Sequence, residues 1–580
     1  MCSINGINFK NEKIIFDITK SNQFRGPDKT NILSYENYYF GFNLLSINSN
    51  RETEIQPKIS ERYIFLFNGE IYNTKKLIDE FKIKGNFNSD TDVLFELIKI
   101  LGTEFIEYID GMYSIVLFDK YEKKYFLFRD RFGTKPLFYY FDGSKFYFSS
   151  SLTSLSKNIL SINLEINKES LNKYINFGYN FGEKTLLNKI NQVENGQIII
   201  FDDKRKILKS KKFISKPTSI KNYENFRSTI RNSFESKHNV ALLLSGGIDS
   251  NILLKENIIF SKERTTAFST KFLDVEDKYN EDFFIAKNQS FKNNVKFEEI
   301  EIDNKMFLDN LKESYKSLEQ PILNIGIPIY YISFKKIRSQ KFRSVIAGDG
   351  GDELFFGYSY QKLLYYFNKF YFFYKHQDYF KNNIYGKKKL LLISYYLLTK
   401  NYDLLFNEIN NLNLFSNKRF YDRLNVFQNN KVSDLKKYFE EDLNFKLSND
   451  FVALKDNLGM SFNLETRFPF LQSSIVNYIN KFSLKKFYNS KINKSFLYNI
   501  YKNEIDKEIF TSRKKGWTIP NTWLIEKETI NFYQNSLPQN YKSFLDSIGI
   551  KFNRQNYDMN IKYRTLIFSL LTWSKKNKLL

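Results

Sequence analysis

The stretch VALLLSGGIDS, residues 240–250, decides how the second half of this chain folds. Its first five residues are apolar and form a run that is typical of a strand buried in a parallel sheet. The small residues SGG follow, and a helical pattern begins near Asp249. A strand, a glycine-rich turn and a helix in this order predict a doubly wound sheet, which binds its ligands at the carboxyl ends of the strands.

The same pattern recurs further along the chain. Strands are predicted over residues 265–269 and 344–347, and the second of these leads into another glycine-rich turn, AGDGGDELFFGY (347–358). Residues 356–450 are rich in Phe, Tyr and Leu at helical spacing, so we interpret them as a helical insertion and not as a membrane-surface helix. The sequence therefore predicts an α/β domain over residues 226–580.

Residues 1–205 have a different pattern, in which short strands alternate with turns. Runs such as 63–67, 113–118 and 145–150 are prone to form strands, and the turn sequences NGE, DG and RFGTKP lie between strands. Residues 91–101 have helical spacing. We expect a first domain of antiparallel sheets with some helices, joined to the second by the lysine-rich linker 206–225.

The charge and apolar content of the 580 residues exclude some classes of protein. A formal net charge of +24 is typical of proteins that bind nucleic acid or an anionic membrane, so both classes of partner have to be considered. The basic residues are spread along the chain without an arginine-rich arm, so nucleic-acid binding is only a disfavoured alternative. The longest conspicuous apolar run, 390–398, is less than half of the ~20 residues that a membrane span needs. Without a signal-peptide pattern, a cytoplasmic location is predicted.

Cys2 is the only cysteine, which excludes an internal disulfide, and with two histidines in the chain a Cys/His zinc site is excluded too. Removal of the initiator methionine would give Cys2 both a thiol and a free α-amino group, whose usual pKa of about 7.7–8 suits a general base. His238 and His376 lie outside the first domain. If Cys2 is a nucleophile, its own amino group is therefore the predicted base.

Six stretches of the first domain resemble the class II glutamine amidotransferase domain in order and spacing. The resemblance implies an α+β N-terminal-nucleophile fold, with antiparallel sheets sandwiched by helices, in which Cys2 attacks the glutamine amide and water resolves the thioester. It implies that Asn68 and the Gly69 N–H form the oxyanion hole, that Asp90 pairs with the substrate ammonium group and that Glu70 completes the glutamine-binding loop. The six stretches are MCSINGI (1–7), RGPD (25–28), FNGEIYN (67–73), SDTD (89–92), DGMYSIVLFD (110–119) and RDRFGTKPLFY (129–139).

The first domain departs from the family where the glutamine α-carboxylate is bound. The family usually supplies an arginine from a basic stretch, but here the sequence is GFNLLSIN, with Leu44 at the arginine position, and Phe24 stands before RGPD. Leucine cannot form a bidentate pair with a carboxylate. Either Arg25 or Arg51 takes over, or glutamine binds weakly and free ammonia serves. We favour a retained glutaminase, because the nucleophile and the oxyanion-hole residues are in place.

The turn SGGIDS can bind an anion, because small residues let backbone N–H groups approach it and a helix N-terminus favours negative charge. Asp249 can bind Mg²⁺ through oxygen, and the lysine of a Walker loop is missing. The turn resembles the PP-loop of ATP pyrophosphatases, and AGDGGDELFFGY resembles the acyl-adenylate motif of the asparagine synthetase family. Further matches to that family are EQP (319–321), LETRFPFL (464–471), KSFLY (494–498) and RKKGWTIPNTW (513–523).

The asparagine synthetase resemblance implies a role for each matching residue. Asp349 acts at the acyl-adenylate step, Asp249 and Asp352 bind Mg²⁺, Glu353 supports the loop, and Lys494 stabilises negative charge when ammonia attacks. Two further departures are Gln320 in EQP and Gln472 after PFL. The residues that the resemblance places around ATP and pyrophosphate are Leu244, Ser245, Gly246, Gly247, Asp249, Ser250, Thr270, Ala347 and Gly348.

Together these features predict glutamine-dependent amide synthesis. Glutamine supplies ammonia internally to a carboxylate that ATP activates with Mg²⁺, and aspartate is the predicted acceptor. Another carboxylate, such as a sugar uronic acid in surface polysaccharide synthesis, is the alternative. A β-lactam-forming relative is disfavoured, because those proteins tend to lack the N-terminal cysteine. The expected partners are small molecules and not nucleic acid, and members of the family are often dimeric.

Overall fold

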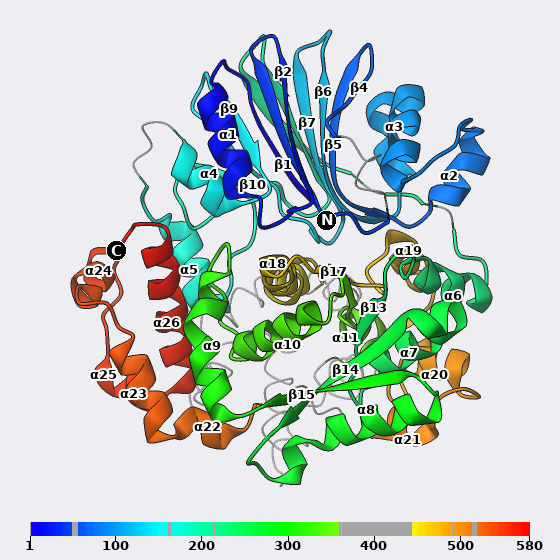
Figure 1. Cartoon of the computed structure of the whole chain (residues 1–580), viewed down its shortest axis with the longest axis vertical. Coiled ribbons are helices and arrows are strands. Elements are labelled where there is room, and N and C mark those ends of the chain that lie inside the picture. The colour runs from blue at the N-terminus through cyan, green and yellow to red at the C-terminus, as the bar shows by residue number, and fades with distance from the viewer. Residues whose placement is uncertain are drawn as a thin grey trace, which may run out of the picture.

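The computed structural model describes residues 2–48, 56–159, 164–213, 215–217, 219–358, 361, 443–489, 491–512 and 519–580. Figure 1 shows two sheets with flanking helices above a third, separate sheet, which is surrounded by the remaining helices. The fold class predicted for each half is confirmed, with antiparallel sheets in the first and a parallel sheet in the second. The predicted insertion 356–450 lies largely outside the described residues.

The first domain contains two six-stranded antiparallel sheets. In the first sheet the order is β10-β8-β9-β1-β3-β2, and in the second it is β12-β11-β7-β6-β5-β4. The strands are β1 (Cys2–Ile7), β2 (Lys29–Tyr35), β3 (Tyr38–Leu44), β4 (Lys58–Ile59), β5 (Tyr63–Ile71), β6 (Gly111–Asp119), β7 (Lys124–Arg129), β8 (Phe138–Phe141), β9 (Phe146–Ser149), β10 (Ile190–Gln192), β11 (Gln197–Asp202) and β12 (Ile207–Lys212).

An aromatic and aliphatic core joins these two sheets. Side chains of β1 and β3, such as Ile4 and Phe42, belong to one buried cluster with Leu66 of β5 and Val116 of β6. Helices α1 (Glu12–Ser21) and α4 (Leu152–Asn158) cover the outer face of the first sheet, and α2 (Thr74–Phe81) and α3 (Asp90–Leu101) cover that of the second (Figure 1). The central strands of each sheet are thus buried on both faces, which explains why so many of their residues are apolar, whereas the edge strands β2 and β12 are largely exposed.

The second domain is built on a five-stranded parallel sheet in the order β15-β14-β13-β16-β17. The chain enters at the central strand, adds two strands on one side and then two on the other, so the order reverses between β13 and β16. Such a reversal leaves a crevice at the carboxyl ends of the two strands. The strands are β13 (Val240–Leu243), β14 (Thr265–Phe272), β15 (Lys296–Ile302), β16 (Ser344–Ile346) and β17 (Glu465–Arg467).

Helices surround this sheet and form the C-terminal part of the chain. The predicted linker 206–225 contains β12 and the start of α6, and the exact domain boundary stays a prediction. A π-type helical segment, Leu443–Val452, continues into α18 (Ala453–Ser461), which lies beside the first domain (Figure 1). The other helices are α5 (Lys168–Phe177), α6 (Tyr223–Asn232), α7 (Ile248–Ser261), α8 (Glu281–Lys292), α9 (Asn304–Lys316), α10 (Ile327–Ser339), α11 (Gly351–Phe355), α19 (Ser473–Ile479), α20 (Ser495–Tyr501), α21 (Lys507–Thr511), α22 (Asn521–Ile525), α23 (Lys527–Asn535), α24 (Tyr541–Ser547), α25 (Arg554–Met559) and α26 (Ile561–Lys576).

No helix among the described residues is long and apolar enough to cross a membrane. The apolar run 390–398 lies outside those residues.

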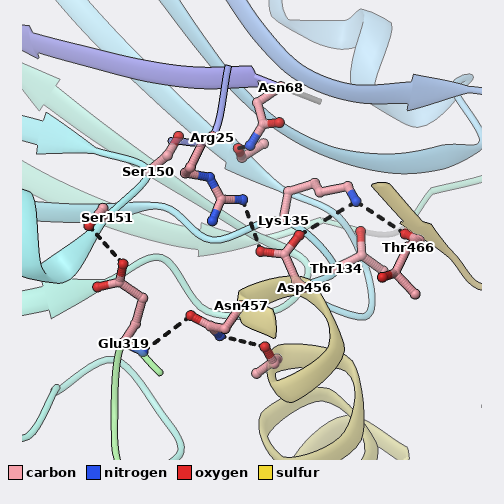
Figure 2. Close-up of polar contacts among 12 residues, drawn as sticks. Arg25, Asn68, Thr134, Lys135, Ser150, Ser151, Glu319, Asp456, Asn457 and Thr466 are labelled. Carbon is pink, nitrogen blue, oxygen red and sulfur yellow. Dashed lines mark hydrogen bonds and ion pairs between the residues drawn. The ribbon is translucent and has the colours of Figure 1, made fainter. Parts of the chain in front are cut away.

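Each domain caps a helix of the other. Asp110 of the first domain accepts hydrogen bonds from the N–H groups of Ser473 and Ser474 at the start of α19, at 2.8 and 3.1 Å. Glu319 of the second domain accepts from the Ser151 hydroxyl at 2.7 Å and from the Thr153 N–H at 2.9 Å, at the start of α4 (Figure 2). A carboxylate at a helix N-terminus satisfies unpaired N–H groups and complements the helix dipole. The two caps therefore fix the domains relative to each other.

A buried ion pair lies between the two caps. The Arg25 guanidinium donates to Asp456 of α18 at 2.9 Å, and both side chains are almost fully buried, at 1% and 2% exposure. The Lys135 ammonium lies 3.7 Å from the other oxygen of Asp456, so two cations of the first domain converge on one carboxylate of the second (Figure 2). Burial lowers the pKa of Lys135, and Asp456 opposes that effect.

Replacing the shared carboxylate should destabilise the protein strongly. Asp456→Asn leaves two buried cations without their counter-ion, and breaking a buried pair in this way costs about 3–5 kcal/mol. We expect a loss of that size in the free energy of unfolding, measured by denaturant titration. The control is Arg554→Gln, which removes an exposed pair with Asp558 and should cost at most about 1 kcal/mol. Equal losses in the two variants would contradict a structural role for the buried pair.

Candidate active sites

Cys2 begins strand β1 at the end of the first sheet that faces the second domain (Figure 1). Its side chain is 7% exposed, and its backbone N–H donates to the Asn68 Oδ1 atom at 2.9 Å. Asn68 lies on β5, in the opposite sheet, and its Nδ2 atom is 3.5 Å from the Ser114 hydroxyl. The backbone nitrogen of Cys2 and the predicted oxyanion residue Asn68 are thus in direct contact.

The next two residues of β5 complete this corner of the first domain. A Cβ atom at Gly69 would lie 2.1 Å from the Met112 carbonyl oxygen, so the close pairing of β5 with β6 permits only glycine there. Glu70 is buried and accepts from Asn48, while its other oxygen lies 3.2 Å from the Arg467 guanidinium of β17. Burial raises the pKa of Glu70, and Arg467 opposes that rise.

Asp90 is the first residue of α3, and its two carboxylate oxygens accept from the backbone N–H groups of Ile71 and Thr91, each at 2.9 Å. These bonds tie the start of α3 to the end of β5, one residue beyond Glu70. All five predicted glutaminase residues therefore lie on β1, on β5 or on the helix joined to β5. Their chemical roles stay predictions.

Leu44 is buried and lies directly opposite Cys2 in the pairing of β1 with β3. Of the two cations considered as substitutes for the missing arginine, Arg25 is 1% exposed and is committed to the ion pair with Asp456. Arg51 lies outside the described residues.

A second site lies at the carboxyl ends of β13, β14 and β16, where the strand order reverses. A cavity of about 790 Å³ opens there, and the SGGIDS and AGDGGDELFFGY turns line it together. Most of the residues predicted to surround ATP and the activated acid belong to its wall, namely Leu244, Ser245, Gly246, Gly247, Asp249, Ser250, Ala347, Gly348, Asp349, Asp352, Glu353 and Lys494.

Thr270 is the exception among the predicted nucleotide contacts. It is buried on β14 and does not line the cavity, although Phe268 and Phe272, two residues before and after it, do. Its hydroxyl has no hydrogen-bond partner among the described residues. Residues two apart on a strand share a face, so Thr270 points to the cavity side of β14 but lies beneath the surface.

Asp249 lies where the two glycine-rich turns meet. A Cβ atom at Gly351 would lie 2.2 Å from an Asp249 carboxylate oxygen, and one at Gly348 would lie 3.2 Å from the Asp249 Cβ atom. Within the first turn, the Ser250 hydroxyl donates to the Ser245 carbonyl oxygen at 2.9 Å. The glycines of the second turn therefore allow it to close onto the first.

Lys494 connects the two carboxylates that were predicted to bind metal. Its ammonium is 2.5 Å from Asp249 and 2.7 Å from Asp352, and its side chain is 3% exposed. Burial lowers the pKa of Lys494, and Asp249 opposes that effect. The residue has a left-handed backbone, with φ of 49°, which is uncommon for lysine and aims its side chain into the site.

The same two carboxylates fit a magnesium ion. One ammonium reaches both of them, so both lie within reach of a single divalent cation. Mg²⁺ in nucleotide sites is held by one or two carboxylates together with substrate phosphates and water. Among the described residues there is no cluster of three or more His, Cys, Asp or Glu side chains arranged to hold a metal. A Mg²⁺ site at Asp249 and Asp352 uses only two carboxylates, so such a cluster is not required.

Several residues of the cavity wall were not predicted from the sequence, and Lys455 and Tyr330 are the two that lie beside Asp349. Lys455 of α18 forms an ion pair with Asp349, and its ammonium lies 4.7 Å from the centre of the Tyr330 ring. Lys455 stands within ALKDNLGM, where the pattern indicates only a helix. One lysine among mostly apolar helix residues was the only sign in the sequence that Lys455 could be a site residue. The burial of the whole helix, which places this lysine in the cavity, could not be predicted from the sequence.

Other matched residues support the site from outside the cavity. Glu353 accepts a hydrogen bond from the Tyr358 hydroxyl at 2.6 Å, which ties the end of the second turn to its middle, and burial raises the pKa of Glu353. Gln320 accepts from the Leu186 N–H at 2.9 Å, and Gln472 donates to the Thr229 carbonyl at 3.0 Å. Both departures from the family thus lie away from the cavity. Residues 513–518 lie outside the described residues.

Comparisons with known proteins agree with this two-site architecture. A family model described as a glutamine amidotransferase domain matches residues 1–213, and one described as asparagine synthase matches residues 223–548. "Putative asparagine synthetase (glutamine-hydrolyzing) 2" of Methanocaldococcus jannaschii is 32% identical over 417 residues, which cover 62% of this chain and 76% of that protein. "Asparagine synthetase (glutamine-hydrolyzing) 1" of Bacillus subtilis is 29% identical over 363 residues, 60% of this chain and 56% of that protein.

Closing the gap between the two turns should damage the second site. Gly351→Ala places a methyl group 2.2 Å from the Asp249 carboxylate oxygen, and overpacking of this kind costs about 1–3 kcal/mol. We expect a lower melting temperature, measured by calorimetry. Gly247→Ala is the matched control, because a Cβ atom there meets only the Ser245 hydroxyl, at 3.3 Å, so its melting temperature should stay near that of the unchanged protein. A Gly351 variant as stable as this control would show that the turns can separate without cost.

Proposed function

The chain belongs to the asparagine synthase family, with a glutamine amidotransferase domain ahead of the synthase domain, and from this we propose that it makes asparagine. In this proposal the first site releases ammonia from glutamine, and the second uses ATP to activate aspartate, which the ammonia then converts to the amide. The products are glutamate, AMP, pyrophosphate and asparagine.

The observation that carries the proposal is a direct connection between the two sites. The Arg467 guanidinium contacts Glu70, beside Asn68 and Gly69, at 3.2 Å. The backbone carbonyl of the same Arg467 accepts from the Ala347 N–H at 3.0 Å, at the start of the second glycine-rich turn. One residue therefore bridges the two sites, which supports internal transfer of ammonia from one reaction to the other.

The first reaction consists of proton transfers and acyl transfers, and Cys2 takes part in both. The Cys2 thiol gives its proton to its own α-amino group, and the sulfur attacks the amide carbon of glutamine. The Asn68 Oδ1 atom accepts from the Cys2 backbone nitrogen, which becomes the α-amino group once Met1 is removed, so the Asn68 Nδ2 end and the Gly69 N–H are the donors for the oxyanion. Each such donor typically contributes about 3–4 kcal/mol. The α-ammonium gives the proton to the amide nitrogen, which leaves as ammonia, and water then hydrolyses the thioester to glutamate and regenerates the thiol.

In the second reaction a carboxylate oxygen of the acceptor bonds to the α-phosphorus of ATP, and pyrophosphate leaves. The N–H groups of the first glycine-rich turn and the start of α7 favour the anionic leaving group. Asp249 and Asp352 would hold Mg²⁺, which neutralises phosphate charge. Ammonia then attacks the acyl carbon, AMP leaves, and Lys494 stabilises the negative charge that develops. Exclusion of water from this cavity when substrates are bound would protect the adenylate from hydrolysis.

Removing the nucleophile should separate the two reactions. Cys2→Ala deletes the thiol at a buried site without adding volume, so glutamine-dependent synthesis and glutaminase activity should fall below detection. Synthesis from ammonium chloride should stay within about twofold, because the second cavity is unchanged. The measurement is asparagine formed with each nitrogen source. Loss of both activities would contradict the assignment of separate sites.

The acceptor is tested by supplying the purified protein with ATP, Mg²⁺, glutamine and one acid at a time. We expect L-aspartate to give AMP and asparagine in equal amounts, measured by chromatography. D-galacturonate is the comparison acid, since a uronic acid is the alternative acceptor. AMP and an amide from galacturonate, with no asparagine from aspartate, would refute aspartate as the acceptor while leaving the two-site chemistry in place.

A further inference from the structure

Helix α18 lies between the first domain and the rest of the second domain (Figure 1), and its residue Lys455 lines the adenylation cavity. Two consecutive residues of this helix have different surroundings. Asp456 contacts Arg25 and Lys135 of the first domain, as Figure 2 shows, whereas Lys455 contacts Asp349 in the wall of the cavity. The helix thus places one lysine in the second site while it is anchored to the first domain.

The surroundings of Lys455 keep it charged in spite of its burial. Its side chain is 5% exposed, and burying an ammonium costs several kcal/mol unless it is paired. Burial alone would lower the pKa of Lys455, but Asp349 and Tyr330 overcome that effect and the pKa is raised. The Phe451 ring, 5.9 Å away, adds a second aromatic neighbour. Lys455 is therefore a permanent cation inside the cavity.

The two lysines of the cavity occupy different parts of it. Among the described residues of its wall, Lys455 and Lys494 are the only Lys or Arg side chains. Lys494 is held by Asp249 and Asp352, beside the turn expected to bind pyrophosphate. Lys455 is held by Asp349 and lies against Tyr330 of α10. If the reacting carboxylate of an acceptor acid lies near Lys494, Lys455 can contact a different group of the same acid.

We propose that Lys455 and Asp349, with Tyr330 beside them, form a subsite that recognises the charged end of the acceptor remote from the reacting carboxylate. The Lys455 ammonium pairs with a second carboxylate, and Asp349 pairs with an ammonium group. This inference rests on the proposed function and deepens it. It confines the acceptor to dicarboxylic acids, favours those that also carry an ammonium group, and excludes monocarboxylic sugar acids, which offer neither a second carboxylate nor an ammonium to this ion pair.

A merely structural role for Lys455, in which it ties α18 to the second glycine-rich turn, makes a different prediction. Loss of such a tie would distort the turn and weaken ATP binding and turnover together. Loss of a recognition group would weaken acceptor binding alone, because Lys494 and the first turn are left intact. The acceptor KM and the ATP KM, measured separately, therefore distinguish the two roles.

The experiment measures pyrophosphate release with ATP and Mg²⁺ for L-aspartate, succinate and D-galacturonate. The unchanged protein should use aspartate best, succinate less well and galacturonate not at all. In Lys455→Gln the KM for aspartate should rise about 10- to 100-fold, as expected when a charged hydrogen bond is lost, with the ATP KM and the glutaminase rate unchanged. Lys455→Arg should recover part of the aspartate affinity.

Lys446→Gln is the matched control, because Lys446 lies on the same helical run over the Tyr358 ring, at 5.4 Å, but does not line the cavity. It should behave like the unchanged protein. If Lys455→Gln loses glutaminase activity, and hence its fold, Lys455→Met provides an uncharged chain of similar shape for the same measurement.

Two results would overturn the subsite. One is an aspartate KM that is unchanged in Lys455→Gln or Lys455→Met, and the other is unchanged protein that uses galacturonate as well as aspartate. Pyrophosphate release with none of the three acids would instead overturn the proposed function itself, and the inference with it.

Discussion

The buried carboxylate of Asp456 joins the two halves of this molecule, together with the two reciprocal helix caps. Two cations of the first domain converge on it, and none of the three groups can be left alone in a dry interface without a large cost. Because Asp456 belongs to α18, the same interaction positions the helix that carries Lys455. The ion pair also occupies Arg25, a residue of the RGPD motif. The chemistry on either side of the interface thus depends in part on an electrostatic contact that touches neither reaction.

The charges inside the second cavity follow a related principle. Each buried lysine there has carboxylate partners, Lys494 with Asp249 and Asp352, and Lys455 with Asp349. Paired in this way, the cations stay in the site before any anionic substrate arrives. Substrates that bring their own phosphates and carboxylates can then exchange partners with groups that are already in place, so little reorganisation is needed when the reaction begins.

Much of this arrangement could be predicted from short stretches of sequence. The run 240–250 predicted strand, turn and helix correctly, because apolar β-prone residues, small residues and a helix start follow each other without interruption. Strand β15 was missed because its sequence, KFEEIEI, is charged, as an edge strand with one exposed face allows. The partners of Arg25 could not be foreseen either. Asp456 lies 431 positions away, and no local pattern encodes a contact between domains.

The reciprocal caps have a consequence for how such a protein can change over time. Asp110 completes α19, and Glu319 accepts from the start of α4 beside that helix's own cap, Ser151, so each domain carries a helix whose first turn the other domain helps to satisfy. A first domain exchanged for that of a distant relative would bring its own glutamine chemistry but would leave the start of α19 without its cap unless a carboxylate at the Asp110 position came with it. The two domains are therefore expected to be inherited together, as one recombination unit, even though each has its own core.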